Sequence, residues 1–122
     1  MSGDATLLAA AGLPDFTVPN EYQSSANFRA FVLDTGANVG KVTAPSAGGD
    51  IHGVVRHPGH GFWAYPGRAL RIEASASFSA GASLVVGTDG RVATGSGITV
   101  AIALEASSGA GAVVWCRIPT GR

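Results

Sequence analysis

Three apolar runs separated by turn residues dominate the last third of this chain and predict a β-sheet. The runs cover residues 84–86, 98–104 and 113–118, and each is rich in β-branched or large side chains. Between Val86 and Val92 the chain reads Gly-Thr-Asp-Gly-Arg, and an Asp-Gly pair tolerates the positive φ that a tight hairpin turn requires. The spacing therefore predicts three strands, with a register that one hairpin sets locally.

A weaker copy of this pattern lies upstream. Residues 36–39, 50–55 and 70–72 resemble residues 81–84, 97–102 and 116–118, in each case at an offset of about 46 residues. That period suits a unit of several strands, and two copies are too few for a solenoid, which needs at least three repeats. We therefore expect two similar halves, about 31–73 and 78–118, that close on each other as one small β-barrel or β-sandwich.

The upstream half is expected to hold strands at 28–33, 39–43 and 51–56. A Pro- and Gly-rich insertion follows at 57–67, which the downstream half lacks. Clustered aromatic residues on a loop commonly form contact surfaces, so contact with another subunit is one interpretation. The other is that these side chains cap an open end of the barrel. The candidate residues of this insertion are His57, His60, Phe62, Trp63 and Tyr65.

The first 28 residues show no strand or helix period and predict an extended N-terminal arm. Residues 4–12 allow at most one short helix, with Asp4 as an N-cap and Gly12 at the C-cap position. The prolines that follow force extended backbone on the residues before them. The arm carries too many apolar side chains for a solvated tail, so we expect it to pack on the body, at residues 29–122, or on another subunit. Its candidate contact residues are Leu13, Phe16, Val18, Pro19, Tyr22 and Phe28.

Length and composition limit the chain to one domain and narrow its partners. With 122 residues it has room for one modest core. Its eight basic and eight acidic residues are scattered singly, so no basic stripe is present that could neutralise nucleic-acid phosphates. No apolar run approaches the roughly 18 residues of a membrane span, and residues 6–11 lack the length and the basic flank that are expected of a secretion signal. We therefore expect synthesis in the cytoplasm, with neither nucleic acid nor a membrane as a direct partner.

No group of residues predicts catalysis, a metal site or a cofactor. His52, His57 and His60 lack carboxylates or thiols at ligand spacing. Cys116 lies in an apolar strand, and its neighbours, Trp115 among them, indicate burial rather than reactivity. Lys41 suggests a biotinyl- or lipoyl-like carrier, but the methionines usual beside such a lysine are absent and Lys41 falls inside an expected strand. We therefore expect a protein that is not an enzyme.

Most of the chain, from about residue 31 to 118, resembles the bacteriophage head decoration proteins, also called capsid cement proteins. The resemblance rests on residues 80–86 (AGASLVV), 88–92 (TDGRV), 102–106 (IALEA) and 113–118 (VVWCRI), with a similar Gly-Val-Val at 53–55. It implies a non-enzymatic subunit on the outer surface of the capsid in the virion. It also implies two partners, namely the major capsid protein and further copies of the chain itself, commonly as a homotrimer.

We therefore predict a mainly β structural protein that binds the outside of a phage head and stabilises contacts between major capsid protein subunits. The arm would contact the capsid, because an extended segment can add a strand to an exposed sheet edge. One alternative is a tail or baseplate subunit. The other is a sugar-binding β module that binds a host-surface glycan, with Trp63 and Tyr65 as its aromatic platform.

Overall fold

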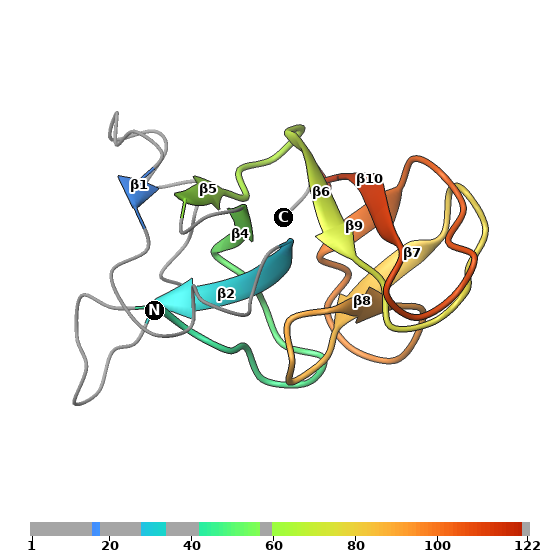
Figure 1. The fold of residues 1–122 in the computed structure, drawn as a ribbon, viewed down its shortest axis with the longest axis horizontal. Coiled ribbons are helices and arrows are strands. Elements are labelled where there is room, and N and C mark those ends of the chain that lie inside the picture. Colours follow the sequence, from blue (N-terminus) through green and yellow to red (C-terminus); the bar gives the residue numbers. More distant parts are fainter. Residues whose placement is uncertain (1–15, 18–27, 34–41, 57–59, 121–122) are drawn as a thin grey trace.

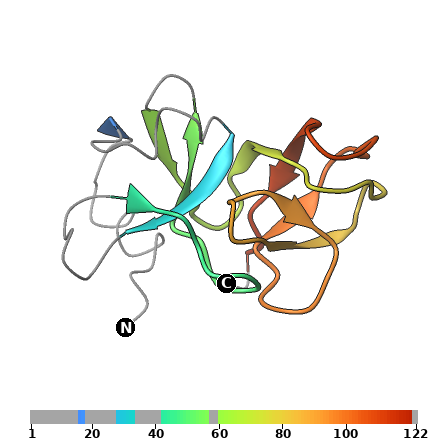
Figure 2. The same ribbon diagram turned by 60° about the horizontal axis from the view of Figure 1, so that its bottom comes forward.

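The computed structural model describes residues 16–17, 28–33, 42–56 and 60–120, which form two antiparallel sheets of five strands each. The first sheet contains β1 (Phe16–Thr17), β2 (Arg29–Leu33), β3 (Val42–Thr43), β4 (Gly53–Arg56) and β5 (His60–Trp63). The second contains β6 (Ala69–Glu73), β7 (Ser83–Val86), β8 (Val92–Ala93), β9 (Ala101–Ala103) and β10 (Val113–Arg117). The sheets lie side by side along the long axis of the molecule (Figures 1 and 2). The predicted mainly β fold is confirmed.

Both sheets have the same strand order. The first runs β1-β5-β4-β2-β3 and the second β6-β10-β9-β7-β8, so each strand has a counterpart five places later in the chain. The internal repeat predicts that residues 70–72 correspond to 116–118, but these segments are neighbours in one sheet, with Leu70 opposite Cys116. That match is wrong because β10 is the counterpart of β5. The two segments look alike because β6 and β10 share the same alternation of exposed and buried residues.

The segment predicted as an aromatic insertion loop contains a strand. β5 pairs with β4 along its length, and Trp63 lies opposite Gly53. The prediction of a loop over 57–67 is therefore wrong for residues 60–63. It gave the Pro-Gly turn signal at 58–59 more weight than the β propensity of the aromatic residues after it.

Other strand boundaries follow the prediction more closely. The strand expected at 28–33 is β2, whereas the one expected at 51–56 begins only at Gly53, and the one expected at 98–104 is limited to 101–103. Ile98 lies before β9, and its N–H donates to the Gly48 carbonyl at 2.9 Å instead of to a neighbouring strand of its sheet. Of the strand expected at 39–43, residues 39–41 lie outside the described residues, as do the short helix expected at 4–12 and most of the arm.

The predicted hairpin turn between β7 and β8 is confirmed. The Gly87 N–H donates to the Arg91 carbonyl at 2.9 Å, and Gly90 has a φ of 82°, a conformation that glycine adopts without strain. The Asp89 carboxylate accepts hydrogen bonds from the Arg91 backbone N–H at 3.1 Å and from the Arg91 guanidinium at 2.7 Å. Burial opposes ionisation of Asp89, but these bonds outweigh it and lower the pKa of the carboxyl group.

One hydrophobic core spans both sheets and draws most of its residues from the second. Along β6 and β10 alternate side chains are buried, so Leu70, Ile72, Val114 and Cys116 all face inward. Because side chains of a strand alternate between its two faces, the remaining residues of these strands form an outer face. The first sheet and its flanks contribute Ala30, Ile51, Val54 and Ala64.

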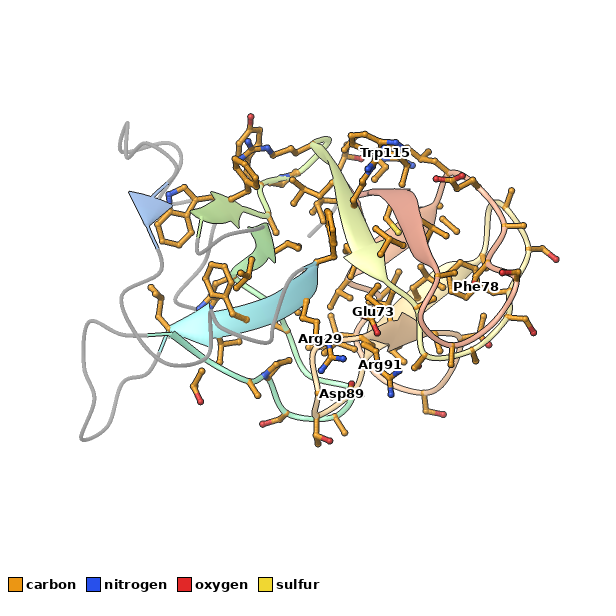
Figure 3. All side chains as sticks on the ribbon, in the orientation of Figure 1. Arg29, Glu73, Phe78, Asp89, Arg91 and Trp115 are labelled. Carbon is orange, nitrogen blue, oxygen red and sulfur yellow. The ribbon has the colours of Figure 1, made fainter. Side chains whose placement is uncertain are left out.

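Charged side chains join the two sheets at one point. Glu73 of β6 pairs with Arg29 of β2 at 3.4 Å and with Arg91 beside β8 at 3.6 Å. Figure 3 shows these side chains and Asp89 gathered where the sheets meet. Backbone bonds support the junction, because the Ala30 N–H donates to the Gly90 carbonyl at 2.8 Å.

Two glycines bring the sheets together at a second point. A Cβ on Gly97 would lie 2.6 Å from the Gly48 Cα, so no other residue fits there without movement. The Gly48 N–H donates to the Val86 carbonyl at 2.8 Å, which links the segment before β4 to β7. The backbones of the two halves are therefore in direct contact.

Candidate functional site

Arg68 lies among aromatic rings between β5 and β6. Its guanidinium carbon is 5.2 Å from the centre of the Phe62 ring and 5.0 Å from that of Tyr65. One guanidinium nitrogen also donates to the Trp63 carbonyl at 3.1 Å. These contacts fix the direction of the arginine head group, because a guanidinium stacks favourably on aromatic faces.

Another arginine and another aromatic residue meet on the outer face of the second sheet. Arg71 of β6 lies directly opposite Trp115 of β10, and its guanidinium carbon is 5.1 Å from the centre of the indole ring. Trp115 is 43% exposed, which is unusual for so large an apolar side chain. In Figure 3 it lies at the top of the second sheet, whereas Glu73 lies lower, near the point where the two sheets meet.

A pocket of about 240 Å³ lies between these two stacked pairs. Both arginines line it, and no acidic side chain is among the described residues of its wall. The first sheet and Phe28 form one side of the wall, and β6 with β10 forms the other. The lining residues are Phe28, Val54, Phe62, Arg68, Ala69, Leu70, Arg71 and Trp115.

Exposed apolar residues continue the outer face beyond the pocket. Val113 is 38% exposed and lies two residues before Trp115, so both side chains point to the same side of β10. Leu104 is 49% exposed, and its N–H donates to the Trp115 carbonyl at 2.9 Å. We call the surface formed by Arg68, Arg71, Leu104, Val113 and Trp115 the arginine–tryptophan surface.

Phe28 is the arm residue that the structure places at this site. Its φ of 62° is uncommon for a residue other than glycine. The backbone is held on both sides, because its N–H donates to the Val55 carbonyl at 2.6 Å and its carbonyl accepts from the Glu73 N–H at 2.7 Å. Phe28 is predicted to contact the capsid. Its place in the pocket wall does not test that prediction.

The remaining arm residues are only partly described. Phe16 lies in β1 and pairs with Gly61 of β5, so this short part of the arm extends a sheet of its own chain. Leu13, Val18, Pro19 and Tyr22 lie outside the described residues. The division of the chain into an arm over 1–28 and a body from residue 29 remains a prediction.

The aromatic residues predicted to contact other subunits separate into different settings. Trp63 is only 7% exposed and packs against Phe31, with 6.4 Å between the ring centres. Tyr65 is 39% exposed, and Phe62 is half-buried in the pocket wall. Trp63 and Tyr65 therefore do not form a shared open platform. His60 is part of β5, and His57 lies outside the described residues.

Sequence reasoning missed Trp115, which it grouped with buried neighbours. The signal that finds it is the alternation along β10, because burial of Val114 and Cys116 places the residues between them on the outer face. Arg71 was missed for the same reason, since it alternates with buried residues of β6. Neither strand reveals from sequence alone which of its faces is covered.

The described residues carry no arrangement that indicates bond-making chemistry. Among them there is no cluster of three His, Cys, Asp or Glu side chains placed to hold a metal ion. Cys116 is buried, and burial, reinforced by the Glu105 carboxylate, raises the pKa of its thiol to about 12. His52 is also buried, and its Nδ1 accepts a hydrogen bond from the Leu33 N–H at 2.8 Å. In the same part of the chain, no helix is long and apolar enough to cross a bilayer.

Fold and surface together describe a two-sheet β domain with exposed tryptophan and aliphatic side chains on one face. No family model and no curated protein matches the chain. Among solved structures, it is similar to the crystal structure of the N base of head fiber gp8.5 in bacteriophage phi29. That likeness has a TM-score of 0.63 at 18% sequence identity, over 78% of this chain and 85% of the other. At this identity the comparison shows a shared fold.

Proposed function

We propose that this protein is a non-enzymatic structural subunit of a phage virion, which binds the outer surface of the head. The observation that carries this proposal is the fold shared with the base of a phage head fiber over most of both chains. The sequence resemblance to head decoration proteins points to the same location independently of that comparison. Both lines of support concern a protein attached to a phage head.

The arginine–tryptophan surface supports a role in binding another protein. Trp, Tyr and Arg are the residues most enriched where a few side chains supply most of the binding energy. Trp115, Tyr65 and the two arginines gather these types around one pocket, beside exposed Val113 and Leu104. We propose that this surface faces the major capsid protein and that the bound subunit ties neighbouring capsid subunits together.

Mass action explains how such binding would stabilise the head. A subunit that binds the assembled shell but not its separated parts favours the assembled state by an amount that grows with its concentration. Copies of the chain would occupy many equivalent sites, and we propose that they do so as homotrimers.

The test is binding of the purified full chain to phage heads assembled without it. We expect saturable co-sedimentation with intact tailless heads, and a higher temperature of head disruption once the sites are filled. Light scattering of the free chain measures its oligomeric number. Failure to bind heads, with binding to tails instead, would replace the proposal with a tail or baseplate role.

A further inference from the structure

The polar side chains that line the pocket beside Trp115 are all hydrogen-bond donors. Arg68 and Arg71 supply two guanidinium groups, and the other described wall residues are apolar apart from the Trp115 indole N–H. No carboxylate, hydroxyl or side-chain amide is among the described wall residues. In a chain whose formal net charge is zero, the described wall therefore carries two positive charges and no negative one, and the nearby Glu105 carboxylate accepts the Trp115 backbone N–H at 2.8 Å.

Both guanidinium groups are oriented before any ligand arrives. Arg68 lies 5.2 and 5.0 Å from the centres of two rings, and Arg71 lies 5.1 Å from the centre of a third. The Arg71 guanidinium has no hydrogen-bond or ion-pair partner among the described residues, and two of its in-plane N–H groups can match the two oxygens of a carboxylate. Arg68, which already donates to the Trp63 carbonyl at 3.1 Å, adds a second positive charge beside it. The arrangement therefore favours an anion with a planar, forked acceptor.

The same contacts disfavour a sugar. A sugar ring stacks on an open aromatic face, but the Trp115 and Tyr65 rings each carry a guanidinium over one face. Sugar hydroxyls also need acceptors, and the described wall offers no side chain that accepts. A volume of about 240 Å³ suits a single amino-acid side chain better than an oligosaccharide.

The surroundings of the pocket favour a polypeptide. Val113 and Leu104 are exposed beside Trp115, so a partner that seats an acidic group between the arginines would also cover apolar surface. From the donors, the stacking and this apolar border, we infer that the pocket receives an Asp or Glu side chain of the capsid protein. The choice of partner rests on the proposed function, whereas the carboxylate chemistry does not.

The first experiment measures binding of variants to heads that lack the chain. Arg71→Ala should weaken binding roughly tenfold to a hundredfold, because it removes hydrogen bonds to a charged group. Arg71→Glu should abolish binding, and Arg71→Lys should recover only part of it, because a lysine keeps the charge but not the fork. Arg117→Ala is the matched control, since it removes one positive charge from the same sheet outside the pocket wall, and it should change binding less than threefold.

The second experiment does not depend on heads. A short peptide with one central Glu is titrated into the isotopically labelled full chain, beside the same peptide with Gln. We expect the Arg71 and Trp115 side-chain N–H signals to shift with the Glu peptide only, and Arg71→Ala to remove the shift of Trp115. Unfolding curves of each variant check that it is folded.

The outcomes separate the two proposals. Wild-type binding to heads with Arg71→Ala unchanged would overturn this inference and leave the proposed function standing. Absence of wild-type binding, with the Glu-dependent shifts present, would overturn the proposed function and keep the carboxylate site. Shifts caused by an oligosaccharide of uronic acids, but not by the Glu peptide, would overturn the inference in favour of an acidic glycan.

Discussion

Glu73 pairs with two arginines, one from each sheet, through a single carboxylate oxygen. That oxygen lies 3.4 Å from a guanidinium nitrogen of Arg29 and 3.6 Å from one of Arg91. Arg29 belongs to the first sheet and Arg91 to the turn region of the second. The Glu73 side chain is 17% exposed, so solvent screens these pairs less than it screens surface pairs.

Glu73→Gln should therefore weaken the junction. We expect the free energy of unfolding to fall by about 1 kcal/mol, because the variant leaves two partly buried arginines without their shared counter-charge. Urea denaturation followed by fluorescence measures the change. Glu105→Gln is the control, because an amide oxygen at that position can still accept the hydrogen bond of the Trp115 backbone N–H. Equal urea midpoints for the two variants would contradict the role of Glu73 at the junction.

Gly97→Ala should be among the most damaging single changes. Its Cβ would lie 2.6 Å from the Gly48 Cα, and its φ of +134° is already unfavourable for alanine. Gly109→Ala provides a matched control, because Gly109 has a φ of +153° and open space around it. We expect the Gly97 variant to lose about 1–3 kcal/mol more than the control, and similar losses would show that packing at this contact is loose.

The two tryptophans should behave oppositely on truncation. Trp63→Ala removes a side chain that is 93% buried and should lower the free energy of unfolding by about 3–5 kcal/mol. Trp115→Ala removes an exposed one and should cost under ~1 kcal/mol while impairing binding to heads. Chemical denaturation and head co-sedimentation measure the two effects, and a reversed order in stability would contradict the assignment of Trp115 to the outer face.

High pH should destabilise the fold through Cys116. The pKa of its thiol is about 12 in the native state, against an ordinary value of 9.0. The native thiol keeps its proton over this interval while the unfolded thiol loses it, so stability falls as pH rises from about 9 to 12. The slope is at most ~1.4 kcal/mol per pH unit. Cys116→Ala should show a shallower decline in urea titrations across this range, and identical slopes would rule out the contribution.

Removal of residues 1–27 should separate binding from folding. The core residues that the structure describes all follow residue 28, so we expect the shortened chain to keep its β circular dichroism spectrum. It would lose the pairing between β1 and β5, in which Phe16 lies opposite Gly61 and Thr17 opposite His60. We expect head binding to be lost, because the arm supplies the remaining predicted contact residues. Unchanged co-sedimentation by the shortened chain would remove the arm from the proposal.

The sequence carried enough information for the fold class and for individual strands. Residues 84–86 and 113–118 are rich in apolar and β-branched residues, and an Asp-Gly pair fixes a local turn. Local sequence was therefore enough to predict these strands and the hairpin. The strand order was harder to predict. Residues 70–72 and 116–118 have the same alternation of exposed and buried side chains, which predicts equivalent places in two copies, whereas the two segments are neighbours in one sheet.

The site was less predictable because its parts come from distant positions. Arg71 and Trp115 are 44 residues apart and meet only through the pairing of β6 with β10. Trp63 looked like an exposed aromatic residue because a Pro-Gly turn precedes its strand, yet the packing of Phe31 against it makes it part of the interior. Burial of one face of a strand is a tertiary property, and no local pattern determines which face that is.

The contact between Gly48 and Gly97 has a mechanical consequence for the role on a phage head that we propose. Where two backbones touch without a side chain between them, there is no soft layer in which one sheet can slide past the other. A pull applied to one half would be transmitted to the other half with little deformation. The two sheets would then move as one rigid body rather than as two flexibly linked units.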